Sequence, residues 1–352
     1  MPKMPFKRTP RDSFGLDIGT SAVKVVQLRE TVGRRTLTAL ASVALPADVI
    51  AEGIIKDPPA VIEAIKEAVA EAGITAREAA IGVAGRELIT KKVQMPEVPS
   101  RELRGAVRLE AEHHIPFALD EVFLDHHVVS RHDGVLDLIL VAVKKSKVIE
   151  YAAVVEEAGF NPVVVDADAF ALANQFELNH PGDFGEAVAL IDVGAAVVKI
   201  NVVRAGASIF ARDIAFGGNY YTQAIADRLH LTFEQAERAK LGETTDTAWT
   251  AIVPALEAVS RDLSLEVRRT FDYFGSTSDA ERIGRIVMSG GAARLPGITE
   301  YLSTTWGIPV EVARPLERID VDPALAERAH TAGAALAVAV GLALRRSGER
   351  RE

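Results

Sequence analysis

Two stretches of the chain share one pattern: FGLDIGTSAVKVVQL over residues 14–28 and VALIDVGAAVVKINVV over residues 188–203. Aligned on their aspartates, Asp17 and Asp192, they also match at a following glycine, valine and lysine. Each pattern is typical of an apolar strand, a tight Asp-x-Gly turn and a second strand. The two aspartates are 175 residues apart, about half the chain. The repeat therefore predicts two related halves rather than a solenoid, whose periods are roughly 20–50 residues.

Composition excludes several classes of protein. The 352 residues suggest about two domains, and a net charge of −9 gives no general attraction to nucleic acid. The chain has no cysteine, which rules out disulfides, thiolate metal sites and cysteine nucleophiles. With no secretory signal, we expect a cytoplasmic protein. The longest apolar stretches are Ala187–Val203, which contains two charges, and Ala332–Leu344, and neither supplies the roughly 20 apolar residues of a membrane span.

Strand-like and helix-like segments alternate along the rest of the chain, which predicts an α/β fold with helices covering the sheets. The expected strands are Ala79–Val83, Leu136–Val143, Val163–Val165 and Ile283–Met288. The expected helices are Asp57–Ala72, closed by Gly73, then Arg101–His114 and Val148–Ala158.

The Asp-x-Gly hairpins carry groups suited to phosphate. Gly19 lets the backbone come close to a ligand, and successive N–H groups in such a turn form an anion-binding concavity. Thr20 and Ser21 add hydroxyl donors, and Lys24 adds a cation. Asp17 repels phosphate directly but can hold a hydrated Mg²⁺. One such turn is usually only a turn, whereas two facing each other would grip a polyphosphate.

Two further glycine-containing segments have open interpretations. MSGGAARLPGI, residues 288–298, places Gly290 and Gly291 after an apolar strand, where bare backbone suits a flat ring or simply turns the chain into a helix starting at 295–297. In residues 217–242, Thr232 resembles a helix start. Glu237 and Lys240 share a helix face there, as a surface ion pair or as a clamp on a nucleoside.

The order of these motifs resembles the actin-like ATPase superfamily. Within it, the chain is most similar to the PilM family of type IV pilus assembly proteins, with some likeness to the division protein FtsA. The segments that carry the resemblance are GIIKD (residues 53–57), VQMPEVPSRELRGAVRLEAEHHIPF (residues 93–117) and VVVDADAFALANQF (residues 163–176). The resemblance covers the chain from about Phe14 to Leu344.

The resemblance implies a duplicated actin-like (ribonuclease H-like) fold with ATP and Mg²⁺ in the cleft between the halves. It implies that the residues contacting nucleotide are Asp17, Gly19, Thr20, Ser21 and Lys24 in the first phosphate loop, Asp192, Gly194 and Ala195 in the second, and Gly217, Gly218, Glu237, Lys240, Gly290, Gly291 and Ala292 around the nucleoside. Asp17 and Asp192 would hold the metal. Gly333 and Gly341 would allow close packing of a last helix that bridges the halves.

The resemblance also implies a division of the chain. The expected units are a basic tail (1–13), a first actin-like half (14–85), an inserted FtsA-type subdomain (86–161), a second half with a returning C-terminal helix (162–344) and a charged tail (345–352).

One departure from the superfamily concerns hydrolysis. Members that hydrolyse ATP well usually keep a hydroxyl residue in the second phosphate loop, where this chain has Ala195, Ala196 and Val197. Each missing charge-assisted bond would cost about 1.5–3 kcal/mol. Asp166 and Asp168 are interpreted as caps of a turn or of the following helix. We therefore expect nucleotide binding with slow or absent hydrolysis and name no catalytic residue.

The implied function is an ATP-binding scaffold at the cytoplasmic face of the inner membrane. It would bind the N-terminal cytoplasmic tail of a PilN-type membrane protein, together with other pilus assembly proteins, and self-association stays open. The alternatives are an FtsA-like filament-forming division or shape protein and a small-molecule kinase, for which no acceptor base is identified.

Five histidines fall within twenty residues, but their spacing does not favour a metal site. They are His113, His114, His126, His127 and His132. Adjacent residues point about 100° apart on a helix and to opposite faces of a strand, so neither adjacent pair readily chelates one ion. We expect surface or interface histidines.

Overall fold

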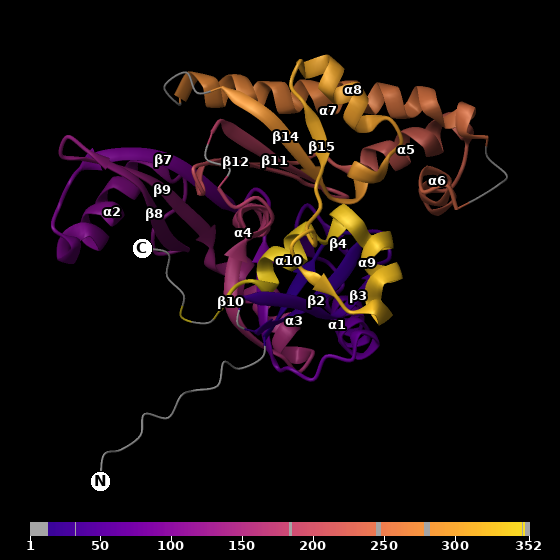
Figure 1. The fold of residues 1–352 in the computed structure, drawn as a ribbon, viewed down its shortest axis with the longest axis horizontal. Coiled ribbons are helices and arrows are strands. Elements are labelled where there is room, and N and C mark those ends of the chain that lie inside the picture. Colours follow the sequence, from indigo (N-terminus) through magenta and orange to yellow (C-terminus); the bar gives the residue numbers. More distant parts are fainter. Residues whose placement is uncertain are drawn as a thin grey trace, which may run out of the picture.

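The computed structural model describes residues 13–31, 33–182, 185–243, 248–277, 282–346 and 348. Two sheets with helices around them form the main body, and a smaller sheet lies beside them (Figure 1). The predicted tails, 1–13 and 345–352, lie largely outside the described residues. No described helix has the length and apolar character that crossing a membrane requires.

The first sheet has the order β10-β6-β1-β2-β3-β16. Its strands are β1 (Ser13–Ile18), β2 (Ala22–Thr31), β3 (Arg34–Ala44), β6 (Glu78–Val83), β10 (Asn161–Ala167) and β16 (Asp320–Val321). Strands β1, β2 and β3 are antiparallel, and β6 and β10 continue the sheet in parallel with β1. The predicted hairpin at Phe14–Gln27 is thus confirmed as β1 and β2.

The second sheet repeats this arrangement in the order β13-β12-β11-β14-β15. Its strands are β11 (Ala187–Val193), β12 (Val198–Arg204), β13 (Ala207–Ile214), β14 (Ile283–Ser289) and β15 (Val310–Val312). Again three antiparallel strands are followed by two parallel ones. The repeat seen in two short sequence stretches therefore extends to five strands of each sheet.

A third sheet, β7-β9-β8, is connected between β6 and β10. It consists of β7 (Leu88–Pro96), β8 (Val122–His132) and β9 (Val135–Lys144), and α2 (Ser100–His114) packs on it through Val107 and Ala111. The following helix, α3 (Lys145–Glu157), buries Tyr151, Val154 and Val155 in the core of the first half instead. The predicted division at residue 161 stays a prediction, and this packing favours a division near Lys144.

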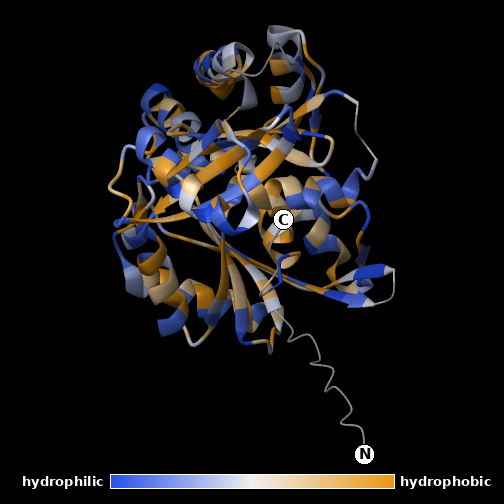
Figure 2. Cartoon of the chain, turned by 90° about the vertical axis from the view of Figure 1, so that its left-hand side faces the viewer, coloured by the Kyte–Doolittle hydropathy of each residue, from blue (hydrophilic) through white to orange (hydrophobic). Residues whose placement is uncertain are grey.

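Helices cover the sheets. In the first half these are α1 (Pro58–Ala72) and α3. Asp57 caps α1 through the Ala60 N–H at 3.1 Å, and Gly73 ends it in the left-handed conformation, as predicted. The remaining helices are α4 (Asp168–Asn179), α5 (Gly218–Leu229), α6 (Phe233–Lys240), α7 (Trp249–Thr277), α8 (Ile298–Trp306), α9 (Ala326–Ala332) and α10 (Ala337–Ala343). Apolar residues concentrate on the strands and hydrophilic ones on the outer helices (Figure 2).

The GIIKD segment (residues 53–57) contains β5 (Ile54–Ile55), which pairs with β4 (Ile50–Ala51) in a small two-stranded hairpin. Side chains of helix α3 form hydrogen bonds with the backbone of this hairpin. The Tyr151 hydroxyl donates to the Gly53 carbonyl at 3.2 Å, and Lys147 donates to the same oxygen. The Ile55 N–H donates to Glu150 at 3.0 Å. The motif therefore joins α1 to α3.

Helix α10 joins the two halves by close backbone contact. A Cβ on Gly15 of β1 would lie 2.3 Å from the Ala339 carbonyl oxygen, and a Cβ on Gly341 would lie 1.9 Å from the Ala171 carbonyl oxygen of α4. Gly341 thus plays the predicted part. Gly333 does not lie within this last helix, because it ends α9 with φ 47° and is the first residue of the short 3-10 turn, Gly333–Leu336, that precedes α10. The helix expected at 295–297 begins at Ile298.

Replacing Gly341 by alanine should destabilise the protein, because the new methyl group would overlap the α4 backbone. Overpacking of this kind costs about 1–3 kcal/mol or more. Gly105→Ala is a matched control, since a Cβ at this exposed position of α2 meets nothing within 4 Å. Better helix propensity should stabilise that variant by about 1 kcal/mol. Urea unfolding of both variants measures the difference, and shifts of the same sign would contradict close packing of α10.

Candidate functional site

The two hairpins place equivalent ion pairs on facing edges of the two sheets. Asp17 is directly opposite Lys24 across β1 and β2, and Asp192 is opposite Lys199 across β11 and β12. The lysine Nζ lies 2.9 Å from Asp17 Oδ2 in the first copy and 3.0 Å from Asp192 Oδ2 in the second. The duplication therefore extends from backbone topology to side-chain chemistry.

The turns themselves are also alike. The Gly19 N–H donates to the Ala22 carbonyl at 3.0 Å, and the Gly194 N–H donates to the Val197 carbonyl at 3.1 Å. Thr20 is half-buried and Ser21 is exposed in the first turn. Ala195 is half-buried in the second turn, which offers no side-chain hydroxyl. Only the first turn presents hydroxyl donors.

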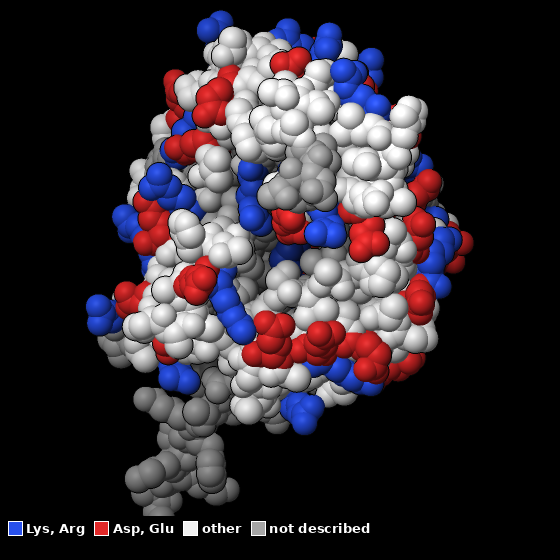
Figure 3. Space-filling model, turned by 90° about the vertical axis from the view of Figure 1, so that its right-hand side faces the viewer, with Lys and Arg blue, Asp and Glu red and all other residues white. Residues whose placement is uncertain are grey.

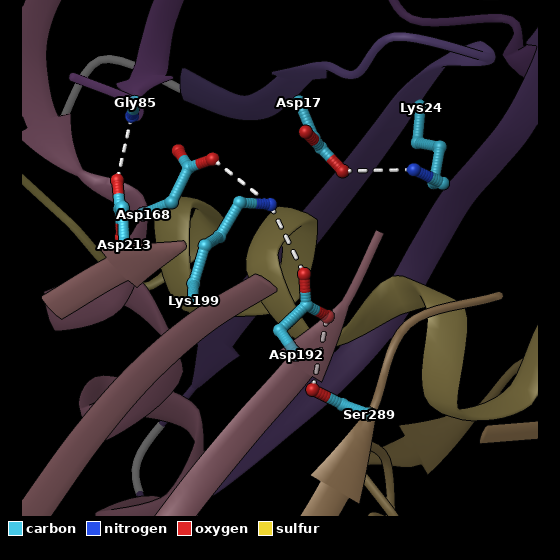
Figure 4. Close-up of polar contacts among 8 residues, drawn as sticks. All are labelled: Asp17, Lys24, Gly85, Asp168, Asp192, Lys199, Asp213 and Ser289. Carbon is cyan, nitrogen blue, oxygen red and sulfur yellow. Dashed lines mark hydrogen bonds and ion pairs between the residues drawn. The ribbon is translucent and has the colours of Figure 1, made fainter. Parts of the chain in front are cut away.

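A third carboxylate, Asp168 at the start of α4, joins the second pair. Lys199 Nζ lies 3.2 Å from Asp168 Oδ2, and the Ser289 hydroxyl donates to Asp192 Oδ1 at 3.0 Å (Figure 4). Asp168 Oδ1 is buried and has no hydrogen-bond partner among the described residues. Asp17 belongs to the other sheet and acts on this group through its charge. The region between the two hairpins, which contains these charged side chains, is called the seam below. The structure thus assembles three carboxylates around one buried ammonium group.

Burial and charge shift the pKa values of this group in a consistent way. Burial alone would lower the pKa of Lys199, but Asp192, Asp168 and Asp17 together raise it well above its ordinary value. Burial raises the pKa of Asp168 to about 6, with Lys199 opposing the shift and the other two carboxylates adding to it. Lys199 is therefore a fixed positive charge.

A separate carboxylate connects the halves. Asp213 lies on β13 opposite Lys199, and its Oδ2 accepts a hydrogen bond of 2.6 Å from the Gly85 N–H. Gly85 follows β6 and leads into the third sheet, so the bond links the second half to that connection (Figure 4). Burial raises the pKa of Asp213 to about 7, and the Gly85 N–H opposes this.

Gly217 and Gly218 bring α5 onto the second turn. The Gly218 N–H donates to the Gly194 carbonyl and the Asn219 N–H to the Ala195 carbonyl, both at 2.8 Å. A Cβ on Gly217 would lie 2.5 Å from the Ala195 carbonyl oxygen, so only glycine allows this approach. The carbonyl groups of the second turn therefore accept hydrogen bonds from the first residues of α5.

Glu237 and Lys240 form an ion pair, but it is not the simple surface pair that the sequence allows as one interpretation. Their side chains are 2.6 Å apart, and the lysine is only 9% exposed. Lys240 also donates to Thr222 Oγ1 at 2.8 Å and to the Gly218 carbonyl at 3.2 Å. Burial lowers the pKa of Lys240, and Glu237 offsets part of this shift. The group links α5 and α6; the nucleoside clamp stays a prediction.

The Gly290–Ala292 segment begins directly after β14. Gly290 has φ 87°, and a Cβ there would lie 2.4 Å from the Val193 carbonyl oxygen at the end of β11. Gly291 is exposed with open space beside it, whereas Ala292 is buried. The first glycine is thus required by packing, and the second leaves bare backbone available.

Four members of this site are not among the residues predicted from the sequence to bind nucleotide or metal: Asp168, Lys199, Asp213 and Ser289. Lys199 had a signal, because it occupies the same place in the repeat as Lys24. Asp168 was interpreted as a cap, but no side-chain cap bond forms at the start of α4. Asp213 and Ser289 had no signal, since their partners lie far away in the sequence.

Charged side chains of both signs surround a hollow on the side of the molecule that Figure 3 faces. A cavity of about 320 Å³ lies between the β13–α5 connection and α7, and its lining shares no residue with the group around Lys199. The histidines lie on α2 and β8, and the described part of the chain holds no cluster of three or more His, Asp or Glu arranged for a metal.

The model of one protein family, described as type IV pilus assembly protein PilM, matches residues 15–347. Among solved structures, the chain is similar to a PilM-PilN type IV pilus biogenesis complex, with a TM-score of 0.85 and 29% identity, over 96% of this chain and 99% of that one.

More distant proteins are also similar. Cell division protein FtsA of Streptococcus pneumoniae serotype 2 (strain D39) is 24% identical, and the alignment covers 87% of this chain and 76% of FtsA. MreB 5 of Spiroplasma citri, solved with bound AMPPNP, has a TM-score of 0.51 at 13% identity, over 97% of this chain and 95% of that one. Together with the two matching sheets, these likenesses confirm the predicted actin-like fold.

Asp213→Asn should make the protein more stable at pH 8 and stabilise it only about a third as much at pH 5, which lies about one unit above the ordinary pKa of 3.8. The folded wild type keeps the Asp213 proton up to about pH 7, while the unfolded chain releases it near its ordinary pKa, so ionisation costs stability as pH rises between them. Because part of this side chain reaches solvent, we expect a gain of roughly 1–3 kcal/mol at pH 8. Denaturant unfolding at both pH values measures it.

Exposed Asp272→Asn on α7 controls for the loss of one negative charge. An Asp213→Asn effect of the same size at both pH values would show that proton release from this carboxyl does not contribute.

Proposed function

Because the chain belongs to the PilM family of type IV pilus assembly proteins, we propose that it is a nucleotide-binding scaffold of the pilus assembly platform. The observation that carries this proposal is the likeness to the PilM-PilN complex over nearly the full length of both chains. The protein would work at the cytoplasmic face of the inner membrane, held there by a PilN-type membrane protein. The likeness to FtsA supports a filament-forming division role less strongly, because its identity is lower and it covers less of the relative.

Residues on both sides of the seam between the sheets have the charge and the open backbone that a nucleotide requires. Lys24 is 18% exposed, so its ammonium group borders the seam and also reaches solvent. Bare backbone at Gly291 leaves space for a flat ring. A bound nucleotide would supply negative phosphates between the halves, held by the Gly19–Ser21 turn and Lys24. Thr222, Glu237 and Lys240 border the proposed nucleoside side.

Hydrolysis is proposed to be slow or absent. The Gly194–Val197 turn has no side-chain hydroxyl that could donate to a phosphate oxygen. Donors aimed at the developing charge are usually the largest contribution to such a reaction. This turn therefore supports binding better than turnover.

An exposed apolar surface around α3 suits the tail of a membrane-anchored partner. Ile54, Phe123 and Ile149 are 43%, 49% and 61% exposed. Phe123 and Ile149 lie on either side of Lys145, whose Nζ is 5.8 Å from the centre of the Phe123 ring and which shares a face of α3 with Ile149. Ile54 belongs to the β4–β5 hairpin, which is bonded to α3 at the neighbouring Ile55. β8 is also an edge strand of its sheet. A peptide tail can bind such a place as an apolar segment or as an added strand.

The connection after β6 provides a route between the two proposed sites. Gly85 is bonded to Asp213 beside the charged group, and β7 begins three residues later. A nucleotide that changes the angle between the halves would move the third sheet relative to α3. By linkage, nucleotide and partner tail should then change each other's affinity by the same factor.

Lys24→Gln should weaken nucleotide binding about tenfold, because it removes one charge-assisted contact and leaves Asp17 uncompensated. Calorimetric titration with ADP measures the affinity. Lys56→Gln, at an exposed lysine outside the seam, should bind as the wild type does. Unchanged affinity in Lys24→Gln would exclude the first hairpin from the phosphate site.

Ile149→Asp and Phe123→Asp should each weaken binding of a PilN-type N-terminal peptide at least tenfold, since truncation of a central apolar contact commonly costs about 2 kcal/mol or more. Fluorescence anisotropy of the labelled peptide measures this, with and without ADP. Leu265→Asp on α7, at a leucine 51% exposed, is the matched control.

If the control loses as much affinity as the two variants, the surface around α3 is not the receptor. Identical peptide affinity with and without nucleotide would exclude the coupling while leaving both sites in place.

A further inference from the structure

Lys199 lies where a cation between the two hairpins would be expected. Its Nζ is 3.0 Å from Asp192 and 3.2 Å from Asp168, it faces Asp213 across β12 and β13, and Asp17 acts on it from the other sheet. The side chain is 11% exposed. One buried ammonium group is therefore paired with two carboxylates, acted on by a third from the other sheet, and placed across the strand pair from a fourth.

The residues expected to hold Mg²⁺ do not fit that task. Mg²⁺ needs oxygen ligands in near-octahedral geometry and is usually bound through one or two carboxylates. Lys24 engages Asp17 Oδ2, and Lys199 and the Ser289 hydroxyl engage both oxygens of Asp192, so Asp17 Oδ1 is the one oxygen of the two carboxylates left for a metal among the described contacts. A divalent ion there would also be repelled by two ammonium groups at close range.

We propose that Lys199 is a built-in counter-cation that replaces the divalent metal, so that the seam binds nucleotide phosphates without requiring Mg²⁺. The nucleotide part of this inference rests on the proposed function. The two lysines of the repeat then have different tasks. Lys24 has one carboxylate partner and some solvent contact, which leaves it available to phosphate. Lys199 is held by two carboxylates and stays in place.

Direct metal binding tests the inference without any nucleotide. Mn²⁺, a paramagnetic substitute for Mg²⁺, is titrated into nucleotide-free protein and the free ion is followed by electron paramagnetic resonance. The wild type should show no saturable binding up to about 1 mM. Lys199→Gln should bind at least tenfold more tightly, because its carboxylates lose their cation. Lys56→Gln, at an exposed lysine outside the seam, should behave as the wild type.

A second arm measures ADP affinity by calorimetry in excess EDTA and in excess Mg²⁺. The wild-type affinities should agree within about threefold, while Lys199→Gln should lose at least tenfold in EDTA. Saturable Mn²⁺ binding by the wild type, or a tenfold loss of its ADP affinity in EDTA, would overturn the inference. If Lys199→Gln does not fold, the wild-type measurements decide alone. If ADP binds in neither buffer, the proposed function fails, and the Mn²⁺ titration still decides the inference.

Discussion

The pairing of buried charges in the seam between the two sheets is the constraint on which the rest of the structure depends. An isolated charge in such a place would cost several kcal/mol, so each must have a partner. Antiparallel pairing of each hairpin supplies that partner, because it sets Asp17 against Lys24 and Asp192 against Lys199. The seam therefore requires both hairpins in correct register. The network must also be complete, since removing one member of a buried pair leaves an uncompensated charge.

Close backbone packing of α10, rather than charge, joins the two halves beside the seam. Helix α10 lies against β1 at Gly15 and against α4 at Gly341, and each contact is too close for any side chain. Helix α4 in turn begins with Asp168, which binds Lys199. The position of this carboxylate therefore depends on two glycines that have no chemistry of their own. Helix α4 therefore connects the close packing at Gly341 with the charged group around Lys199.

The sequence pattern predicted the fold better than the site, for physical reasons. A repeat of Asp-x-Gly hairpins reports local strand and turn formation, and both sheets contain the predicted hairpin. The charged group depends on contacts between segments that are distant in sequence: Gly85 and Asp213 are 128 residues apart, and Ser289 meets Asp192 across 97. Nothing local marks Asp213 or Ser289. Asp168 has a local interpretation as a helix cap, and only tertiary packing turns it toward Lys199. In the same way, the spacing of apolar residues predicts α3 as a helix but does not predict that α3 packs in the core of the first half.

The duplicated hairpins show how one local structure takes two roles through its surroundings. In the first half, Lys24 meets one carboxylate and the adjoining turn carries the hydroxyl groups of Thr20 and Ser21. In the second half, Lys199 meets two carboxylates, the turn carries alanines, and α5 covers its carbonyl groups. The first hairpin is therefore equipped to respond to an anion, and the second to hold its shape. Strand β13, which pairs with β12 of the second hairpin, carries Asp213 and so bonds the second half to Gly85, just before the third sheet begins.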